Sequence, residues 1–182
     1  ILLSALQGEY WKPVESGHSD HKEMASLVKG ATIHPPSYSF KTCVSPHYAA
    51  ELEGMEIKKE KLIPPKTNAT LIIEGCGGLM VPYTASLLQI DLLSSWDGSI
   101  VLVSKNYLGS INHSLLSLHL IKQKNLPLLG IIFNGESYPA GEKVILEYAQ
   151  KPCLGRMEQE QSITPSIIKK YAEQWEPHKW FP

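Results

Sequence analysis

Three short runs of apolar residues stand out along the chain. They span residues 70–75, 99–104 and 127–134, and each ends in glycine or polar residues. Continuous apolar runs of this length are typical of strands buried on both faces, as in a parallel sheet covered by helices. We therefore expect three buried parallel strands.

Apolar residues at helical spacing occupy the segments between and around these runs. Residues 86–96 and 110–125 show this spacing, and Ser110 is a good helix N-cap. Further helices are expected at residues 45–54 and 166–175. The alternation of strand and helix predicts an α/β fold with a doubly wound, mostly parallel sheet.

The beginning of the chain predicts a short strand that runs into Pro13. Lys12 precedes Pro13, and a residue before proline is pushed towards extended backbone, so Lys12 is expected at the end of that strand. Residues 63–68 (IPPKTN) predict a loop and not a domain linker. We expect a single domain over residues 1–182.

Composition narrows the class of protein. The chain has 182 residues, 43% of them hydrophobic and 19% charged, as in ordinary globular proteins. A net charge of −1 gives no electrostatic case for nucleic acid or an anionic membrane as a partner. Apolar runs of about six residues are far too short to span a membrane. Three widely spaced cysteines favour a reducing cytoplasm over a disulfide framework.

Polar and glycine-rich residues follow each predicted strand. The sequence KPVESG follows the first, Glu74 and GCGG the second, KNYLGSINH the third and Asn134 the fourth. The carboxyl ends of parallel strands meet at one edge of a sheet, where ligands bind in such folds. We therefore expect the functional residues at this edge.

Glu74 is a candidate magnesium ligand. An acid directly after an apolar strand resembles the carboxylate that holds Mg²⁺ beside phosphates in phosphoryl-transfer enzymes. The glycines that follow, Gly75, Gly77 and Gly78, would let backbone amides approach an anion closely. A tight turn carrying an exposed acid is the alternative.

Asp20 is a second candidate ligand. Taken alone, it fits the polar start of a helix that continues to Leu27. Its place at the same sheet edge as Lys12 and Glu74 favours the metal site, because two carboxylates and a lysine suit Mg²⁺ and a transferring phosphate.

The segment LGSINH places Gly109, Ser110 and Asn112 at a helix N-terminus, where free amides attract a carboxylate or phosphate. An ordinary N-cap explains Ser110 equally well. The spacing of the histidines matches no metal motif, so we expect them to be structural residues or surface residues.

Five segments in order, KPVESG, SPHYAAELEG, IIEGCGGLMVPYT, LVSKNYLGSINHSLLS and GIIFNG, resemble the dethiobiotin synthetase family over about residues 10–155. The resemblance implies a P-loop NTPase-like fold and a homodimer. It also implies an ATP-dependent cyclo-ligase of biotin biosynthesis. That enzyme joins CO₂ to 7,8-diaminopelargonic acid (7,8-diaminononanoate) and yields dethiobiotin, ADP and phosphate.

The resemblance also implies residue roles. Lys12 looks like the active-site lysine, and Asp20 and Glu74 look like the two Mg²⁺ carboxylates. The nucleotide would lie near Gly75, Cys76 and Gly77, with Asn134 recognising adenine. Substrate-binding residues would be Ser16, Ser45 and Pro46, together with Gly109, Ser110, Ile111 and Asn112, which would take the distal carboxylate from the neighbouring subunit.

Two departures from the family pattern stand out. The phosphate-binding motif GxxxxGK[ST] occurs nowhere in the chain, so we expect the N-terminal strand and its P-loop to lie upstream of a truncated sequence. Residues 158–161 (EQEQ) replace an apolar segment beside adenine, which leaves the nucleotide preference open. The alternatives are a MinD/ParA-like nucleotide switch and a degenerate binding scaffold.

Overall fold

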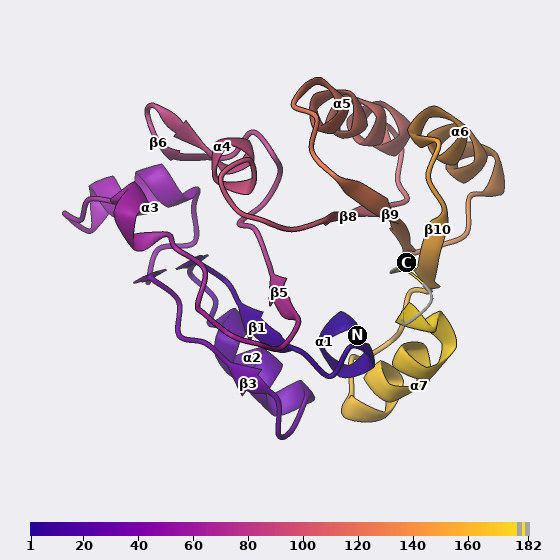
Figure 1. The fold of residues 1–182 in the computed structure, drawn as a ribbon, viewed down its shortest axis with the longest axis horizontal. Helices are drawn as coiled ribbons and strands as arrows, with labels where there is room; N and C mark the ends of the chain where they lie inside the picture. The colour runs from indigo at the N-terminus through magenta and orange to yellow at the C-terminus, as the bar shows by residue number, and fades with distance from the viewer. Residues whose placement is uncertain (178–179, 181–182) are drawn as a thin grey trace. The chain divides into compact units, whose positions relative to one another are not determined.

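The computed structural model describes residues 1–177 and 180, and the chain forms two compact α/β units (Figure 1). Unit 1 consists of Ile1–Trp96 and Thr164–Ala172, and unit 2 of Asp97–Ile163 and Glu173–Pro182. Each unit has its own parallel sheet. The α/β class with mostly parallel strands is confirmed, whereas the single domain over residues 1–182 stays a prediction.

Unit 1 is built on the sheet β3-β1-β5, with β1 (Glu9–Trp11) at its centre. Both neighbours, β3 (Thr32–Ile33) and β5 (Leu71–Ile73), run parallel to β1. The central strand is buried, because its Tyr10 and Trp11 side chains are each only 2% exposed. The strand predicted over residues 70–75 is confirmed as β5, in a shorter form, but its three residues are only partly buried.

Helices flank these strands in the chain order that the sequence predicts. The first, α1 (Leu2–Ala5), precedes β1, and α2 (Asp20–Leu27) begins after the N-cap residue Ser19. In the last helix, α7 (Pro165–Trp175), Ile168 and Tyr171 are buried. The helices predicted over residues 166–175 and up to Leu27 are confirmed.

A second group of short elements completes unit 1. The parallel pair β2 (Val14–Ser16) and β4 (Tyr38–Phe40) packs with α3 (Pro46–Leu52) in one apolar core. The 3₁₀ helix η1 (Lys59–Lys61) precedes the predicted loop. The helix predicted over residues 86–96 is shorter, because β7 (Leu87–Leu88) pairs with β6 (Pro82–Thr84) and α4 covers only Gln89–Leu93.

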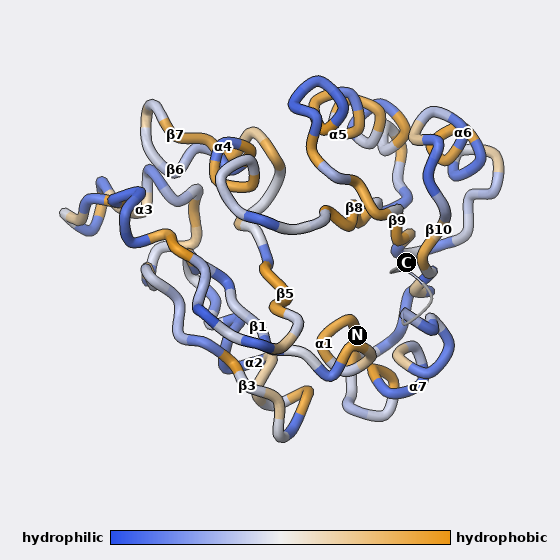
Figure 2. Tube along the Cα trace, in the orientation of Figure 1, coloured by the Kyte–Doolittle hydropathy of each residue, from blue (hydrophilic) through white to orange (hydrophobic). Residues whose placement is uncertain are grey.

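Unit 2 is a three-stranded parallel sheet in the order β10-β9-β8. Its strands are β8 (Ile100–Lys105), β9 (Leu128–Asn134) and β10 (Cys153–Met157), and Figure 2 shows β8 and β9 as apolar segments. Two helices, α5 (Ser110–Gln123) and α6 (Pro139–Ala149), pack side by side against this sheet (Figure 1). The core between them contains Leu118, Ile131, Phe133 and Ile145.

The start of α5 differs from the prediction. Gly109, and not Ser110, is the N-cap residue, and Ser110 is the first residue of the helix. The backbone of Gly109 has φ = +97°, a left-handed conformation that glycine adopts without a steric penalty. This conformation turns the chain sharply from the end of β8 into α5. Within the described residues, no helix combines the length and apolar character needed to span a membrane.

Candidate active site

Lys12, Asp20 and Glu74 meet in unit 1. Lys12 directly follows β1, Glu74 directly follows β5, and Asp20 is the first residue of α2. The ammonium Nζ of Lys12 lies 2.8 Å from Asp20 Oδ2 and 2.8 Å from Glu74 Oε1. Because β1 and β5 are parallel neighbours, their carboxyl ends bring the lysine and the glutamate together.

Charge and burial explain how this cluster holds the lysine. The Lys12 side chain is only 11% exposed. Burial alone would lower the pKa of Lys12, but hydrogen bonds and charge from Asp20 and Glu74 outweigh burial and hold this pKa above its usual value. The ammonium therefore stays charged, and the cluster of two carboxylates and one ammonium keeps a net negative charge.

Tyr10 binds the other oxygen of the Glu74 carboxylate. Its hydroxyl donates to Glu74 Oε2 at 2.7 Å. Burial, and then the negative charge of Glu74, raises the pKa of Tyr10, so the hydroxyl remains a donor. This residue was not predicted, although side chains two apart on a strand share a face, and Tyr10 stands two residues before Lys12.

A buried glutamate fixes the beginning of α2. Glu15 is fully buried in β2, and its carboxylate accepts from the His21 backbone N–H at 2.7 Å. The second oxygen lies 2.7 Å from His21 Nδ1. Because His21 follows Asp20 in the first turn of α2, these contacts hold Asp20 in place. This role of Glu15 was not predicted, because its partner His21 lies on another element.

Ser16 and Cys76 lie beside this cluster. The Ser16 hydroxyl is buried and lies next to the Cys76 thiol, with which it can form a hydrogen bond. Burial raises the pKa of the Cys76 thiol, and the positive charge of Lys12 offsets part of that rise. The predicted substrate residue Ser16 and the predicted nucleotide residue Cys76 therefore lie in the same region as Lys12.

Gln89 holds the glycine-rich segment after β5. Its Oε1 accepts from the Cys76 backbone N–H at 2.6 Å, and its Nε2 donates to the Gly78 carbonyl at 3.2 Å. A side chain at Gly75 would come within 2.5 Å of the Gln89 amide, which explains the glycine there. Since the Cys76 amide already donates to Gln89, it is not free to bind an anion in this conformation. Sequence reasoning missed Gln89 because it reads as one helical residue among leucines.

Ser45 and Pro46 lie at the start of α3, away from these contacts. The Ser45 carbonyl accepts from the amides of Tyr48 and Ala49, and Pro46 is buried. Across the described residues, no hydrogen bond or ion pair joins Ser45 to Lys12, Asp20 or Glu74. The structure thus confirms the helix start but leaves its substrate role a prediction.

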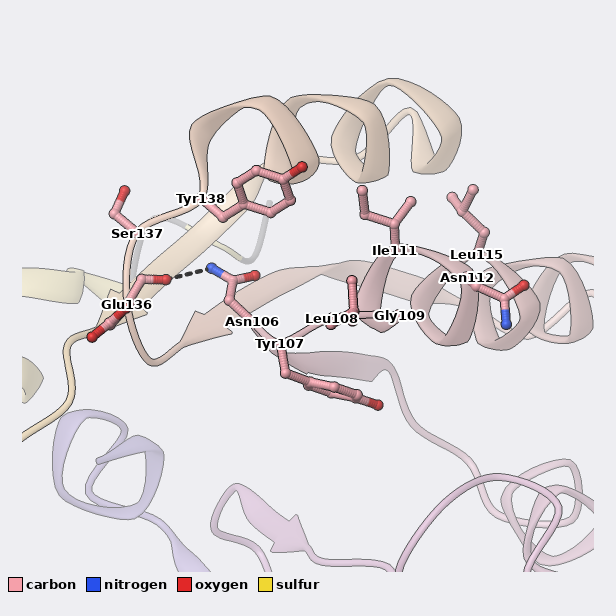
Figure 3. Close-up of a pocket in the computed structure, with 10 residues that line it drawn as sticks. All are labelled: Asn106, Tyr107, Leu108, Gly109, Ile111, Asn112, Leu115, Glu136, Ser137 and Tyr138. Atoms are coloured by element: carbon pink, nitrogen blue, oxygen red, sulfur yellow. Dashed lines mark hydrogen bonds between the residues drawn. The ribbon is translucent and has the colours of Figure 1, made fainter.

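Unit 2 contains a pocket of about 840 Å³ at the beginning of α5 (Figure 3). Three of the predicted substrate residues, Gly109, Ile111 and Asn112, line this pocket. Ser110 lies between them, and its buried hydroxyl has no partner among the residues described. The other lining residues are Asn106, Tyr107, Leu108, Leu115, Glu136, Ser137 and Tyr138.

A polar network borders the pocket. Glu142 Oε1 accepts from Asn106 Nδ2 at 2.6 Å and from the Tyr138 amide at 2.9 Å, and it pairs with Arg156. Asn106 also donates to the Glu136 carbonyl at 2.8 Å, as the dashed line in Figure 3 shows. The network ties the ends of β8 and β10 to the start of α6, and it was not predicted.

Asn134 ends β9 beside this network. Its carbonyl accepts from the Asn106 amide at 3.0 Å, and its side chain is partly exposed. The structure therefore places Asn134 at the carboxyl end of β9, in a different sheet from the one that ends at Lys12 and Glu74, whereas a single common sheet edge was predicted. Its role towards adenine is not tested by any of these contacts.

The two carboxylates of unit 1, Asp20 and Glu74, suit Mg²⁺ better than a metal ion whose ligands all come from protein side chains. The described residues contain no group of three or more His, Cys, Asp or Glu side chains that could hold a metal ion. Mg²⁺ commonly binds through one or two carboxylates, with phosphate oxygens and water as its other ligands. The Asp20 and Glu74 pair matches this pattern.

Comparisons with known proteins cover most of the chain. Residues 1–166 match a family model described as an AAA domain. An ATP-dependent dethiobiotin synthetase BioD of Chlamydia pneumoniae is 41% identical over 178 residues, which cover 96% of this chain and 80% of the relative. The protein of the same description from Chlamydia abortus is 42% identical, with 96% and 85% covered. That from Christiangramia forsetii is 38% identical over 180 residues, with 96% and 86% covered.

Proposed function

Because the chain belongs to the ATP-dependent dethiobiotin synthetase family, we propose that it joins CO₂ to 7,8-diaminopelargonic acid (7,8-diaminononanoate) and closes the cyclic urea of dethiobiotin. ATP is the third substrate and is converted to ADP and phosphate. The observation that carries the proposal is the cluster in which the Lys12 ammonium lies 2.8 Å from both Asp20 and Glu74.

The reaction consists of three bond-forming steps. One amine of the diamine attacks the carbon of CO₂ and loses a proton, which gives a carbamate. A carbamate oxygen then attacks the γ-phosphorus of ATP, and ADP leaves. The second amine attacks the carbonyl carbon of the resulting carbamic–phosphoric anhydride, phosphate leaves, a proton is lost and the ring closes.

Lys12 supplies positive charge where these steps collect negative charge. A carbamate and a transferring phosphoryl group are both anionic, and an ammonium at a partly buried position stabilises them more strongly than one in water. Asp20 and Glu74 hold this ammonium in place and keep it protonated. The role of Lys12 is therefore electrostatic, and positioning of the substrates does the rest.

Asp20 and Glu74 are the residues that would hold Mg²⁺. When bound, Mg²⁺ offsets the negative charge of the β- and γ-phosphates and of the phosphoryl group in flight. Glu15 supports this arrangement, because its carboxylate accepts from the His21 amide and so fixes the first turn of the helix that carries Asp20.

Other residues would bind the substrates. The Ser16 hydroxyl would contact the diamine or its carbamate, and the α3 start at Ser45 and Pro46 would border the same substrate. Gly109, Ser110, Ile111 and Asn112 would take the distal carboxylate at the pocket of a second subunit. Gly75–Gly77 would approach the nucleotide and Asn134 its adenine. We further propose a homodimer that works in the cytoplasm.

The direct test incubates the protein with ATP, Mg²⁺, bicarbonate and the diamine and follows dethiobiotin by mass spectrometry. We expect dethiobiotin, and we expect the diamine to stimulate ATP hydrolysis. Nucleotide-dependent dimerisation without that stimulation would instead favour a MinD/ParA-like switch. A protein that neither hydrolyses ATP nor dimerises would instead favour a binding scaffold.

A further inference from the structure

Both oxygens of the Glu74 carboxylate are bound by side chains of a single neighbouring strand segment. Oε1 faces Lys12, and Oε2 accepts from the Tyr10 hydroxyl. We propose that Tyr10 is a positioning residue, which orients Glu74 for the divalent cation and thereby sets the affinity of the site for that cation. This inference rests on the proposed function, because it takes Glu74 as a cation ligand.

Glu74 needs an anchor because it lies where a side chain is otherwise free to rotate. It follows the last residue of β5, and its side chain is 48% exposed. Its backbone is fixed by the bond from its amide to the Trp11 carbonyl, at 3.0 Å. The carboxylate itself is held only by contacts at its own oxygens, so those contacts decide its orientation.

Tyr10 is a rigid anchor, whereas Lys12 is a flexible one. The Tyr10 side chain is 2% exposed and lies in the central strand of its sheet, so its hydroxyl has little freedom to move. Lys12 reaches Glu74 through a long side chain that we expect to turn towards phosphate or carbamate during the reaction. Tyr10 is then the contact that remains on Glu74.

The two contacts also assign different roles to the two oxygens. The same Lys12 ammonium touches Glu74 Oε1 and Asp20 Oδ2, so these two oxygens face a common positive charge. The hydrogen bond from Tyr10 to Oε2 keeps Oε1 turned towards that charge. A cation that binds both carboxylates would therefore use Oε1, while Oε2 stays with the tyrosine.

The test measures Mn²⁺ binding in the presence of ATP, by electron paramagnetic resonance or calorimetry. Tyr10→Phe removes the hydroxyl and keeps the buried ring, so the fold should persist. We expect it to weaken Mn²⁺ binding by about threefold to tenfold, a fraction of what a hydrogen bond to a charged group contributes. The midpoint Mg²⁺ concentration for activity should rise in parallel.

The matched control is Tyr38→Phe. Tyr38 is also buried in unit 1, and its hydroxyl accepts from the Lys58 amide at 2.9 Å, with no contact to Glu74. It should lower thermal stability as much as Tyr10→Phe does, or more, and leave Mn²⁺ binding unchanged. In the Glu74→Gln background, Tyr10→Phe should have no further effect on Mn²⁺ binding, since the two act through one contact.

Three outcomes would overturn the inference. Wild-type Mn²⁺ affinity in Tyr10→Phe would show that the hydroxyl does not position the ligand. Additive losses in the double variant would show that Tyr10 acts by another route. Equal binding by the wild type and Glu74→Gln would remove Glu74 as a ligand. A wild type that binds Mn²⁺ through Glu74 but forms no dethiobiotin would contradict the proposed function alone.

Discussion

Lys12 is the residue whose charge the chemistry needs most, and two carboxylates hold it in place. We expect Lys12→Ala to lower the rate of dethiobiotin formation by about 100-fold or more, because the loss removes transition-state stabilisation. The fold should persist, since Asp20 and Glu74 are partly exposed and water can solvate them. Steady-state kinetics and thermal unfolding measure the two effects.

Lys58→Ala is the control for this prediction. Lys58 pairs with Glu56 at 3.7 Å, and both side chains are mostly exposed. Its removal should leave both turnover and stability near those of the wild type. A Lys12→Ala protein as active as Lys58→Ala would show that the lysine has been given the wrong role.

The site residues at strand ends could be predicted from the sequence, whereas the buried polar residues that hold them in place could not. Lys12 and Glu74 follow apolar strands, and parallel pairing brings them to one edge. Tyr10, Glu15 and Gln89 are buried polar residues, and their partners lie on other elements. Such partners depend on strand pairing and helix packing, which residue patterns alone do not specify.

At the scale of the element, Gly109 controls how α5 begins. An alanine there would have to adopt φ = +97°, so we expect Gly109→Ala to lower the free energy of unfolding by about 1–2 kcal/mol. Chemical denaturation measures this loss. Gly98 is the control, because no atom lies within 4 Å of an added Cβ and its φ is not in the left-handed region. Equal effects of Gly98→Ala and Gly109→Ala would contradict the argument.

The Glu142 network predicts a dependence of stability on pH. Burial raises the pKa of Glu142, but the hydrogen bonds from Arg156, the Tyr138 amide and Asn106, together with the charge of Arg156, outweigh burial and leave this pKa below its usual value. The folded state thus favours the ionised form of Glu142. The stability that this ionised carboxylate contributes is fully present above the unfolded pKa of about 4.3, and it is lost as the pH falls through the folded pKa.

Glu142→Gln tests whether ionised Glu142 makes the protein more stable at neutral pH than at acidic pH. We expect the variant to be less stable than the wild type at pH 7, with a difference that shrinks as the pH falls below about 4. Urea unfolding of both proteins across this range measures it. A difference that stays constant down to the most acidic condition would exclude an ionised Glu142 as its source.

Two elements of unit 2 were not predicted at all. The helix α6 buries Gly141 and Ile145, and Ala149 packs against the same core, so its sequence does carry a helical face, although a short one. Gly155 and Arg156 interrupt the apolar pattern of β10. Both elements pack on β9, and Glu142 of α6 pairs with Arg156 of β10. Such contacts between elements do not appear in the spacing of apolar residues within one segment.

At the scale of the whole molecule, strand order was the part that the sequence could not supply. The apolar runs correctly predicted β5, β8 and β9 as strands, and the strand–helix alternation predicted parallel pairing. Only β9 is largely buried, whereas β5 is partly buried and Val103 of β8 is exposed. That β1 lies between β3 and β5, however, depends on contacts between distant segments. Short strands such as β3 and β4 carry too few residues for a periodic signal.

The central claim is that this protein carboxylates the diamine and closes the ring. Mass spectrometry of a reaction with ATP, Mg²⁺, the diamine and ¹³C-bicarbonate tests it most directly. We expect dethiobiotin that carries the label in its ring carbonyl, formed only when ATP and the diamine are both present. Hydrolysis of ATP without any labelled dethiobiotin would contradict it.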